Sequence, residues 1–214
     1  MCLRYALETV EFAALRARFG VENAPKLVSR WNIAPTQKVP AVLASAPNEL
    51  SMPSWGMPRQ GKQAEGFHFN ARAETVAELP SFADSFQERR CLMIADSFYE
   101  WKKPNNDPFR LRLIGEDKLF AFAGIYNDAG CCMITVPPNK LVSQVHDRMP
   151  AILDKKDEKD YLKLTAKEAL ELLKPYPAEK MEMDALSREI NSSKSEGKGL
   201  VRVLKKEEGL AGWQ

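Results

Sequence analysis

The middle of the chain is a series of short apolar segments, and this series limits the fold more than any other feature. The segments lie at residues 91–95, 98–101, 109–114, 119–126 and 131–136. Apolar runs of this length that are bounded by turn residues are typical of strands, whereas a buried helix needs roughly ten residues or more. We therefore expect a sheet-rich core, in which residues 115–117 form the hairpin turn between two of these strands.

A few helices are expected on either side of this series. Their predicted ranges are residues 9–19, ended by Gly20, then 81–89, 155–164 and 166–174, the last preceded by a capping-box pair, Thr165 and Glu168. Further strands are expected at residues 39–44, 50–57, 181–186 and 200–204, and residues 191–198 read as a polar loop. The pattern predicts an α+β fold with a twisted antiparallel, β-barrel-like core flanked by short helices.

Length and cysteine content restrict the kind of protein. A chain of 214 residues suits a single domain, with a core from about residue 2 to residue 204, and it can bury this core without metal or disulfide bonds. The cysteines, Cys2, Cys91, Cys131 and Cys132, form no C-x-x-C pair. Structural zinc, another metal site, a cofactor and a disulfide framework are therefore not expected, and free thiols fit a reducing, cytoplasmic location.

The net charge and the hydropathy pattern bear on the partners. The net charge is only +2, so a nucleic-acid surface would have to come from local clustering of basic residues. No apolar run approaches the roughly 20 residues that cross a bilayer, and we expect no membrane association.

Cys2 is the first candidate for chemistry. Met1 is normally removed when the second residue is small, and Cys2 would then carry an α-amine and a thiol on adjacent carbons. The reference pKa values of these two groups lie near 8 and 8.5, so both are partly reactive at neutral pH. Together they can condense with an aldehyde, first to an imine and then to a five-membered thiazolidine. The alternative is that Cys2 is simply a small residue in an opening strand.

Three further motifs carry polar groups of catalytic type. If residues 69–75 are extended, Asn70, Arg72 and Glu74 share one face, backed by alanines; a solvated edge strand would look the same. In the Phe98-Tyr-Glu-Trp motif, Glu100 lies among aromatic residues that would raise its pKa and suit it to proton transfer, although a surface glutamate beside core aromatics is also common.

The third motif is Val145-His-Asp-Arg-Met-Pro. His146 is one of only two histidines in the chain, and a lone histidine is more often structural than catalytic. Histidine is nevertheless suited to proton transfer near neutral pH, and Arg148 is suited to gripping a phosphate with two hydrogen bonds.

Taken in this order, the motifs resemble the SOS response-associated peptidase (SRAP) family of abasic-site processing proteins. The resemblance runs from Met1 to about Leu204. Its markers are Met1-Cys2, the stretch from Trp31 to Gln37, Trp55-Gly56, the stretch from Asn70 to Thr75, Arg89 to Leu92, Ala95-Asp96, Phe98 to Trp101, Ala123-Gly124 and His146 to Pro150.

The resemblance implies a β-barrel-like α+β domain that binds single-stranded DNA with abasic sites, including sites near single-strand to double-strand junctions, and that links its N-terminal cysteine to the opened sugar. It implies that Cys2 is the nucleophile, that Asn70 positions the amine and the sugar, and that Glu100 and His146 transfer protons. The residues it implies for DNA binding are Arg4, Asn32, Pro35, Trp55, Arg72, Trp101, Thr135 and Arg148. We expect a monomer.

Two other functions stay open on the sequence. A cysteine-type peptidase or amidohydrolase would use Cys2 and His146 with Glu100 or Asn70, and its action could include removal of its own Met1. A non-covalent single-stranded-DNA-binding module would need only the aromatic and arginine side chains.

Overall fold

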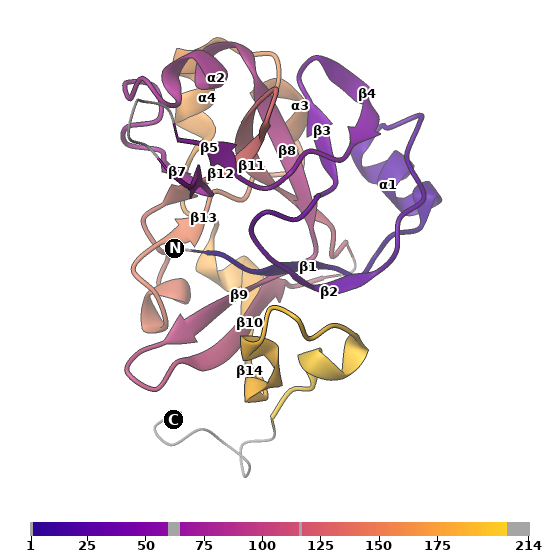
Figure 1. Ribbon diagram of the computed structural model, residues 1–214, viewed down its shortest axis with the longest axis vertical. Coiled ribbons are helices and arrows are strands. Elements are labelled where there is room, and N and C mark those ends of the chain that lie inside the picture. The colour runs from indigo at the N-terminus through magenta and orange to yellow at the C-terminus, as the bar shows by residue number, and fades with distance from the viewer. Residues whose placement is uncertain (1, 60–64, 116, 205–214) are drawn as a thin grey trace.

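The computed structural model describes residues 2–59, 65–115 and 117–204. It is built on two large sheets that lie one above the other in Figure 1. The lower sheet is antiparallel, and its strands run in the order β14 (Met181–Ala185), β10 (Asp107–Leu113), β9 (Ser97–Lys102), β1 (Tyr5–Leu7) and β2 (Arg30–Ile33).

The upper sheet carries most of the apolar segments from the middle of the chain. Its main path runs β13 (Met149–Pro150), β12 (Gly130–Val136), β11 (Phe120–Asn127), β8 (Arg90–Ala95), β3 (Ala41–Leu43) and β4 (Ala46–Ser51). Strand β7 (Asn70–Arg72) pairs with β12 in parallel, and a separate pair is formed by β5 (Met57–Pro58) and β6 (Phe67–His68). The predicted α+β class and the twisted, mainly antiparallel core are confirmed. The core consists of two open sheets that face each other, so it resembles a barrel but its strands do not form a closed ring.

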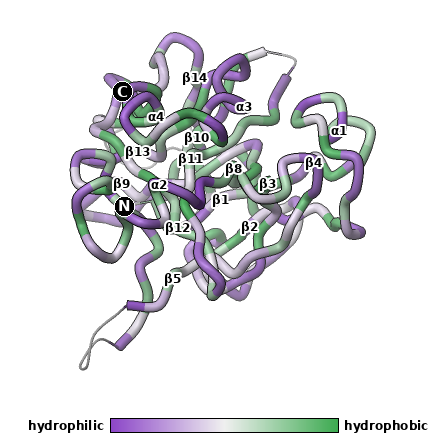
Figure 2. The backbone as a smooth tube through the Cα atoms, turned by 90° about the horizontal axis from the view of Figure 1, so that it is seen from above, coloured by the Kyte–Doolittle hydropathy of each residue, from purple (hydrophilic) through white to green (hydrophobic). Residues whose placement is uncertain are grey.

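The two sheets meet through aromatic side chains. The ring of Phe122 lies 5.6 Å from that of Tyr5 and 6.0 Å from that of Phe98, both in edge-on contacts. All three are fully buried, and edge-on packing is the favoured geometry for aromatic pairs. Figure 2 shows hydrophobic residues along these central strands and hydrophilic ones mainly on the outer loops.

Between β8 and β9 the chain passes from the upper sheet to the lower one with only Asp96 between the two strands. This residue separates β8 from β9, and its Oδ2 accepts hydrogen bonds from the backbone N–H groups of Glu8 (2.6 Å) and Thr9 (2.9 Å). Beyond it, side chains of β9 alternate as the sequence predicts. Phe98 joins the main core, whereas Tyr99 and Trp101 belong to a second apolar cluster on the other face. Glu100 therefore shares the inward face with Phe98.

Short helices border the sheets. They are α1 (Phe12–Phe19), α2 (Ala83–Glu88), α3 (Glu158–Tyr161) and α4 (Ala166–Leu172), with single 3₁₀ turns at η1 (Val142–Gln144), η2 (Ala178–Lys180), η3 (Arg188–Asn191) and η4 (Lys198–Val201). Gly20 ends α1 with a φ of 74°, in the left-handed region that favours glycine, and Thr165 and Glu168 form the predicted capping box at α4. The helix expected over residues 155–164 is only the single turn of α3.

Two predictions about strands are wrong. Strands β10 and β11 do not form a hairpin, because β10 pairs with β9 and β14 while β11 pairs with β8 and β12. The hairpin turn instead lies between Lys102 and Asp107, where Asn106 has a φ of 54°. Residues 200 and 201 end η4, and Val203 then makes one isolated bridge to Leu186, so the described residues 200–204 do not form a strand.

Candidate active site

Cys2 lies just before β1 and is fully buried. Its Sγ donates to the backbone oxygen of Arg4 at 3.5 Å. Burial raises the pKa of the Cys2 thiol well above its usual value, and the nearby carboxyl of Glu100 raises it further. The thiol is therefore protonated at neutral pH, and the carboxyl of Glu100 lies near the sulfur.

Asn70 fixes the backbone of Cys2. It stands on β7 opposite Met133, and its Nδ2 donates to the backbone oxygen of Cys2 at 3.0 Å. The Oδ1 atom of Asn70 is buried and has no hydrogen-bond partner among the described residues. The amide thus holds the residue that carries the thiol and keeps one acceptor available beside it.

Glu100 is a buried carboxyl on the inward face of β9. It pairs in register with Phe109 of β10 and is 2% exposed. Its Oε1 lacks a hydrogen-bond partner within the described part of the chain. Burial raises the pKa of Glu100 to about 8, because the charged form loses its hydration. At neutral pH this side chain is mostly an uncharged acid.

His146 follows η1 and faces Glu100 from the other side. Its Nε2 lies 3.9 Å from Oε2 of Glu100, and its Nδ1 accepts a hydrogen bond from the backbone N–H of Arg148 at 3.0 Å. Burial lowers the pKa of His146. The carboxylate of Asp147 also approaches Nδ1, at 3.0 Å, but its side chain is 90% exposed and water screens its charge. With Nδ1 used as an acceptor, the proton of the neutral ring lies on Nε2, toward Glu100.

The fold brings these four side chains together from distant parts of the sequence. Cys2 contacts Asn70 directly, the carboxyl of Glu100 lies near Cys2, and Glu100 is near His146. Their catalytic roles stay predictions, but a thiol, an amide, a carboxylic acid and an imidazole lie close to one another in this structure.

Three of the residues predicted to bind DNA form a cluster beside this group. The guanidinium of Arg4 donates to Oδ1 of Asn32 at 2.6 Å and lies 5.5 Å from the ring centroid of Trp101. Burial lowers the pKa of the Arg4 guanidinium from its usual value, but the group stays charged at neutral pH. Arg4 and Trp101 are both partly exposed, so a cation and an aromatic face lie together near Cys2.

The Arg148 side chain is hydrogen-bonded to other residues of the protein. It makes a two-point ion pair with Glu74, at 2.6 and 2.9 Å, and donates to the backbone oxygen of Thr135 at 2.6 Å. This pair holds the segment after β7 against the segment that carries His146. Arg72 lies exposed on β7, and Pro35 is partly exposed.

Three predicted DNA-binding side chains, among them Asn32 of this cluster, are inaccessible in this structure. Trp55 and Thr135 are fully buried and Asn32 is 1% exposed. The indole Nε1 of Trp55 donates to the backbone oxygen of Phe69 at 2.9 Å, and its ring lies 5.4 Å from Tyr5. Trp55 therefore supports the wall behind Cys2, and it offers no face on which a base could stack.

Comparison with known proteins gives the family. A family model described as "SOS response associated peptidase (SRAP)" matches residues 1–193. The chain belongs to the SRAP family. It is 35% identical to the abasic site processing protein YoqW of Bacillus subtilis over 94% of this chain and 99% of that protein. It is 27% identical to the abasic site processing protein YedK of Escherichia coli, over 95% of this chain and all of YedK.

Solved structures show the same fold. A protein from Bacteroides thetaiotaomicron superposes with a TM-score of 0.83 at 24% identity, over 95% of this chain and all of that one. A protein from Bordetella bronchiseptica gives a TM-score of 0.74 at 23% identity, over 87% and 100% of the two chains. The two-sheet fold of this SRAP chain is thus also present in the crystal structures of these two proteins.

Two features of the SRAP site do not follow from the sequence. The sequence predicts only that Glu74 shares a face with Asn70 and Arg72, whereas in the structure it forms the ion pair with Arg148. The sequence predicts a polar loop at residues 191–198 and does not indicate that this loop contacts Asn32 and Trp31. The opposite charges of Glu74 and Arg148 are visible in the sequence, but their pairing depends on the fold.

The described residues contain neither a candidate metal site nor a candidate membrane-spanning helix. No group of three or more histidine, cysteine, aspartate or glutamate side chains in them is arranged to hold a metal ion. Within the same ranges, no helix has both the length and the apolar character needed to cross a membrane. All four cysteines, Cys2, Cys91, Cys131 and Cys132, are free thiols and buried.

Proposed function

We propose that this SRAP protein processes abasic sites in single-stranded DNA, and that it does so by forming a thiazolidine crosslink through Cys2 after Met1 has been removed. The observation that carries the proposal is the grouping of Asn70, Glu100 and His146 around Cys2. The relatives in Bacillus subtilis and Escherichia coli that bear the name abasic site processing protein support the choice of lesion.

The proposed reaction needs only the two groups of an N-terminal cysteine. The α-amine of Cys2 attacks the aldehyde carbon of the ring-opened deoxyribose and gives a carbinolamine. The carbinolamine loses its hydroxyl group, which takes up a proton from an acid and leaves as water, and it becomes a protonated imine. The sulfur then adds to the imine carbon while the thiol proton returns to the conjugate base of that acid, which closes the five-membered ring. One water leaves overall, and no oxidant or reductant is consumed.

The neighbouring side chains have protonation states that suit these steps. With a pKa of about 8, Glu100 is mostly protonated at pH 7 and can donate its proton to the departing hydroxyl. The resulting carboxylate can then take the proton of the Cys2 thiol, whose pKa is raised by burial, as the sulfur attacks. The Nε2–H of neutral His146 can donate toward the sugar ring oxygen as the ring opens. Run backwards with the uptake of one water, the same transfers would hydrolyse the crosslink and release the DNA with its abasic site.

Basic and aromatic side chains near Cys2 would hold the strand. Arg4 and Arg72 can contact phosphates from partly or fully exposed positions, and Trp101 offers a ring beside Arg4 on which a base can stack. Arg148 would reach a phosphate by exchanging its partner Glu74 for it. Affinity should fall as salt rises, because each phosphate contact releases counterions.

The state of the thiol argues against a peptidase. A nucleophilic cysteine in a cysteine–histidine pair has a lowered pKa, so that the thiolate is present before the substrate binds. Burial raises the pKa of the Cys2 thiol instead, and its Sγ donates to the Arg4 backbone. A thiol that loses its proton only during ring closure fits condensation with an aldehyde better than attack on an amide.

Intact mass of the protein before and after mixing with an abasic single-stranded oligonucleotide tests the proposal. The first spectrum reports whether Met1 has been removed. We expect the second to show the mass of protein plus oligonucleotide less one water, in a product that survives heating in detergent. Undamaged DNA should give no adduct. The Cys2→Ser variant keeps the amine and should give only an imine, visible after borohydride reduction. Absence of an adduct with processed wild-type protein would sink the proposal.

A further inference from the structure

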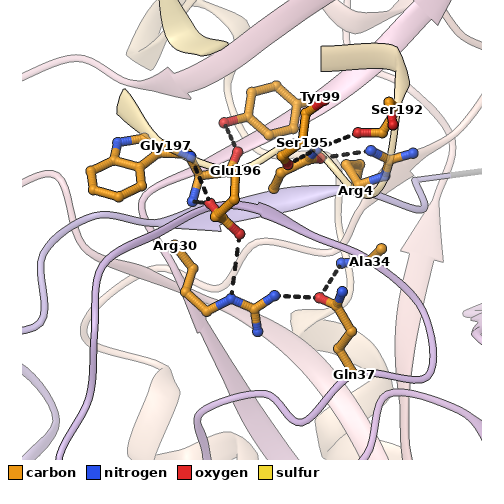
Figure 3. A network of polar contacts seen from close by, with 11 residues as sticks. Arg4, Arg30, Ala34, Gln37, Tyr99, Ser192, Ser195, Glu196 and Gly197 are labelled. Atoms are coloured by element: carbon orange, nitrogen blue, oxygen red, sulfur yellow. Dashed lines mark hydrogen bonds and ion pairs between the residues drawn. The ribbon is translucent and has the colours of Figure 1, made fainter. Parts of the chain in front are cut away.

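Residues 188–197 lie across the cluster of Arg4, Asn32 and Trp101. Figure 3 shows Ser192 and Ser195 of this segment beside Arg4. The backbone oxygen of Ile190 accepts from the guanidinium of Arg4 at 3.2 Å. The side-chain oxygen of Asn191 accepts from Nε1 of Trp101 at 2.7 Å. This segment, here called the strap, therefore uses polar groups that the proposed function assigns to DNA.

The strap continues along Asn32 to the edge of the lower sheet. Nδ2 of Asn32 donates to the backbone oxygens of Ser192 and Ser195, at 2.8 Å each. Strand β2 is the last strand of that sheet, so one of its edges has no neighbouring strand among the described residues. An open edge presents backbone N–H groups that need another acceptor. Here the acceptor comes from a side chain of the strap.

That side chain is Glu196. Its Oε1 accepts the backbone N–H of Trp31 at 2.6 Å, and its Oε2 lies 3.6 Å from Nε of Arg30. Gln37 holds the Arg30 guanidinium through its own Oε1, which also accepts the backbone N–H of Ala34 at 3.0 Å (Figure 3). The carboxylate thus sits between a backbone N–H and a positioned guanidinium.

This pair of donors suits a phosphate as well as it suits a carboxylate. Arginine side chains and backbone N–H groups are both common donors to nucleic-acid phosphates. The ion pair is open to exchange, since the Arg30 and Glu196 side chains are 28% and 42% exposed and a pair of this kind contributes little stability. Gly197 follows directly with a φ of 116° and open space around its Cα, so the chain can turn there without a clash.

We propose that the Arg30 guanidinium and the Trp31 backbone N–H form a phosphate subsite for the DNA strand, which Glu196 occupies in the free protein. The strap then competes with the strand, and binding of a phosphate at this subsite expels the carboxylate. The inference rests on the proposed function in one respect, namely that the ligand beside Arg4 and Trp101 is a nucleic-acid strand.

Non-covalent affinity for an undamaged, fluorescein-labelled oligothymidylate, followed by anisotropy at fixed salt, tests this inference. Glu196→Gln should bind about three- to tenfold more tightly than wild type, as expected for loss of one charged competitor. Glu189→Gln is the matched control, because it removes the same charge from an exposed position of the same strap. It should change the affinity by much less.

A second variant shows whether the gain acts through the subsite. Arg30→Gln should weaken binding, and adding Glu196→Gln to it should restore nothing. The inference is overturned if Glu196→Gln binds no better than Glu189→Gln, or if its gain persists without Arg30. These outcomes are separate from crosslinking. If wild type forms the adduct but Glu196→Gln does not change the affinity, the phosphate-subsite inference is wrong and the proposed function stands. If Glu196→Gln changes the affinity but no adduct forms, the proposed function is wrong and the phosphate subsite stands.

Discussion

The Nε2 atom of His146 lies 3.9 Å from the Oε2 atom of Glu100, and burial shifts the pKa values of these two groups in opposite directions. The pKa of the carboxyl rises to about 8 and that of the imidazole falls, so at neutral pH both are mainly uncharged. The distance is also too long for a direct hydrogen bond. The pair is thus a neutral acid beside a neutral ring, and each group can exchange protons with a substrate that reaches it.

The raised pKa of Glu100 makes the stability of the protein depend on pH. The usual value is 4.5 and the folded value is about 8, so the folded chain binds an extra proton between these pH values. The resulting stability is fully present below about pH 4.5 and is lost as pH rises through about 8. Glu100→Gln should remove this loss and be more stable than wild type at pH 9 by on the order of 3 kcal/mol.

Urea unfolding of both proteins from pH 5 to pH 9 measures this difference. Asp96 and Glu158 also have raised pKa values, about 6 and about 7, but they are common to both proteins and cancel in the comparison. A gap between wild type and Glu100→Gln that stays constant over this range would show that Glu100 is not buried as an acid.

Asn70 should affect the rate of adduct formation more than DNA affinity. Its Nδ2 donates to the Cys2 backbone oxygen at 3.0 Å, and a bond of this kind is worth about 1 kcal/mol. Asn70→Ala should slow crosslinking by about fivefold to tenfold. Asn70→Asp should slow it more, because a carboxylate would face the Cys2 carbonyl. Single-turnover gels give the rates, and anisotropy with undamaged DNA should show nearly unchanged affinity in both variants.

Arg148 and Glu74 should be energetically coupled. Their two-point ion pair joins the segment after β7 to the His146 segment, although the Glu74 side chain is 46% exposed. Since water screens one partner, the coupling free energy in a double-mutant cycle of Arg148→Met and Glu74→Gln should be about 1 kcal/mol or less and should shrink in high salt. Arg148→Lys keeps the charge but loses the second hydrogen bond, so it should recover only part of the coupling.

Gly130 should tolerate no side chain. A Cβ at this position would lie 2.3 Å from the backbone oxygen of Gly56 and 2.5 Å from that of Ser54, and neither backbone atom can move easily. Gly130→Ala should therefore lower the free energy of unfolding by about 3 kcal/mol. Gly199→Ala is the matched control, since a Cβ there meets nothing within 4 Å. Equal urea midpoints for the two variants would contradict this.

The parts of this fold that depend on neighbouring residues could be predicted. The apolar segments became β8 to β12, Gly20 ended α1, and Thr165 capped α4, because each signal lies within a few positions of its effect. The turn after β10 could not be predicted in the same way. A turn-like sequence occurs at residues 115–117, but strand pairing depends on which sheet each strand joins, and β10 and β11 join different sheets.

By itself, the sequence determined the α+β class, the short strands and the residue types of the candidate site, since periodicity and motif are properties of the local chain. Only the tertiary structure decided that Asn70 reaches Cys2 across 68 positions, that Glu100 loses its water, and that Glu196 reaches Trp31 across 165 positions. The physical reason is that burial and contacts between distant residues are set by how the two sheets pack together.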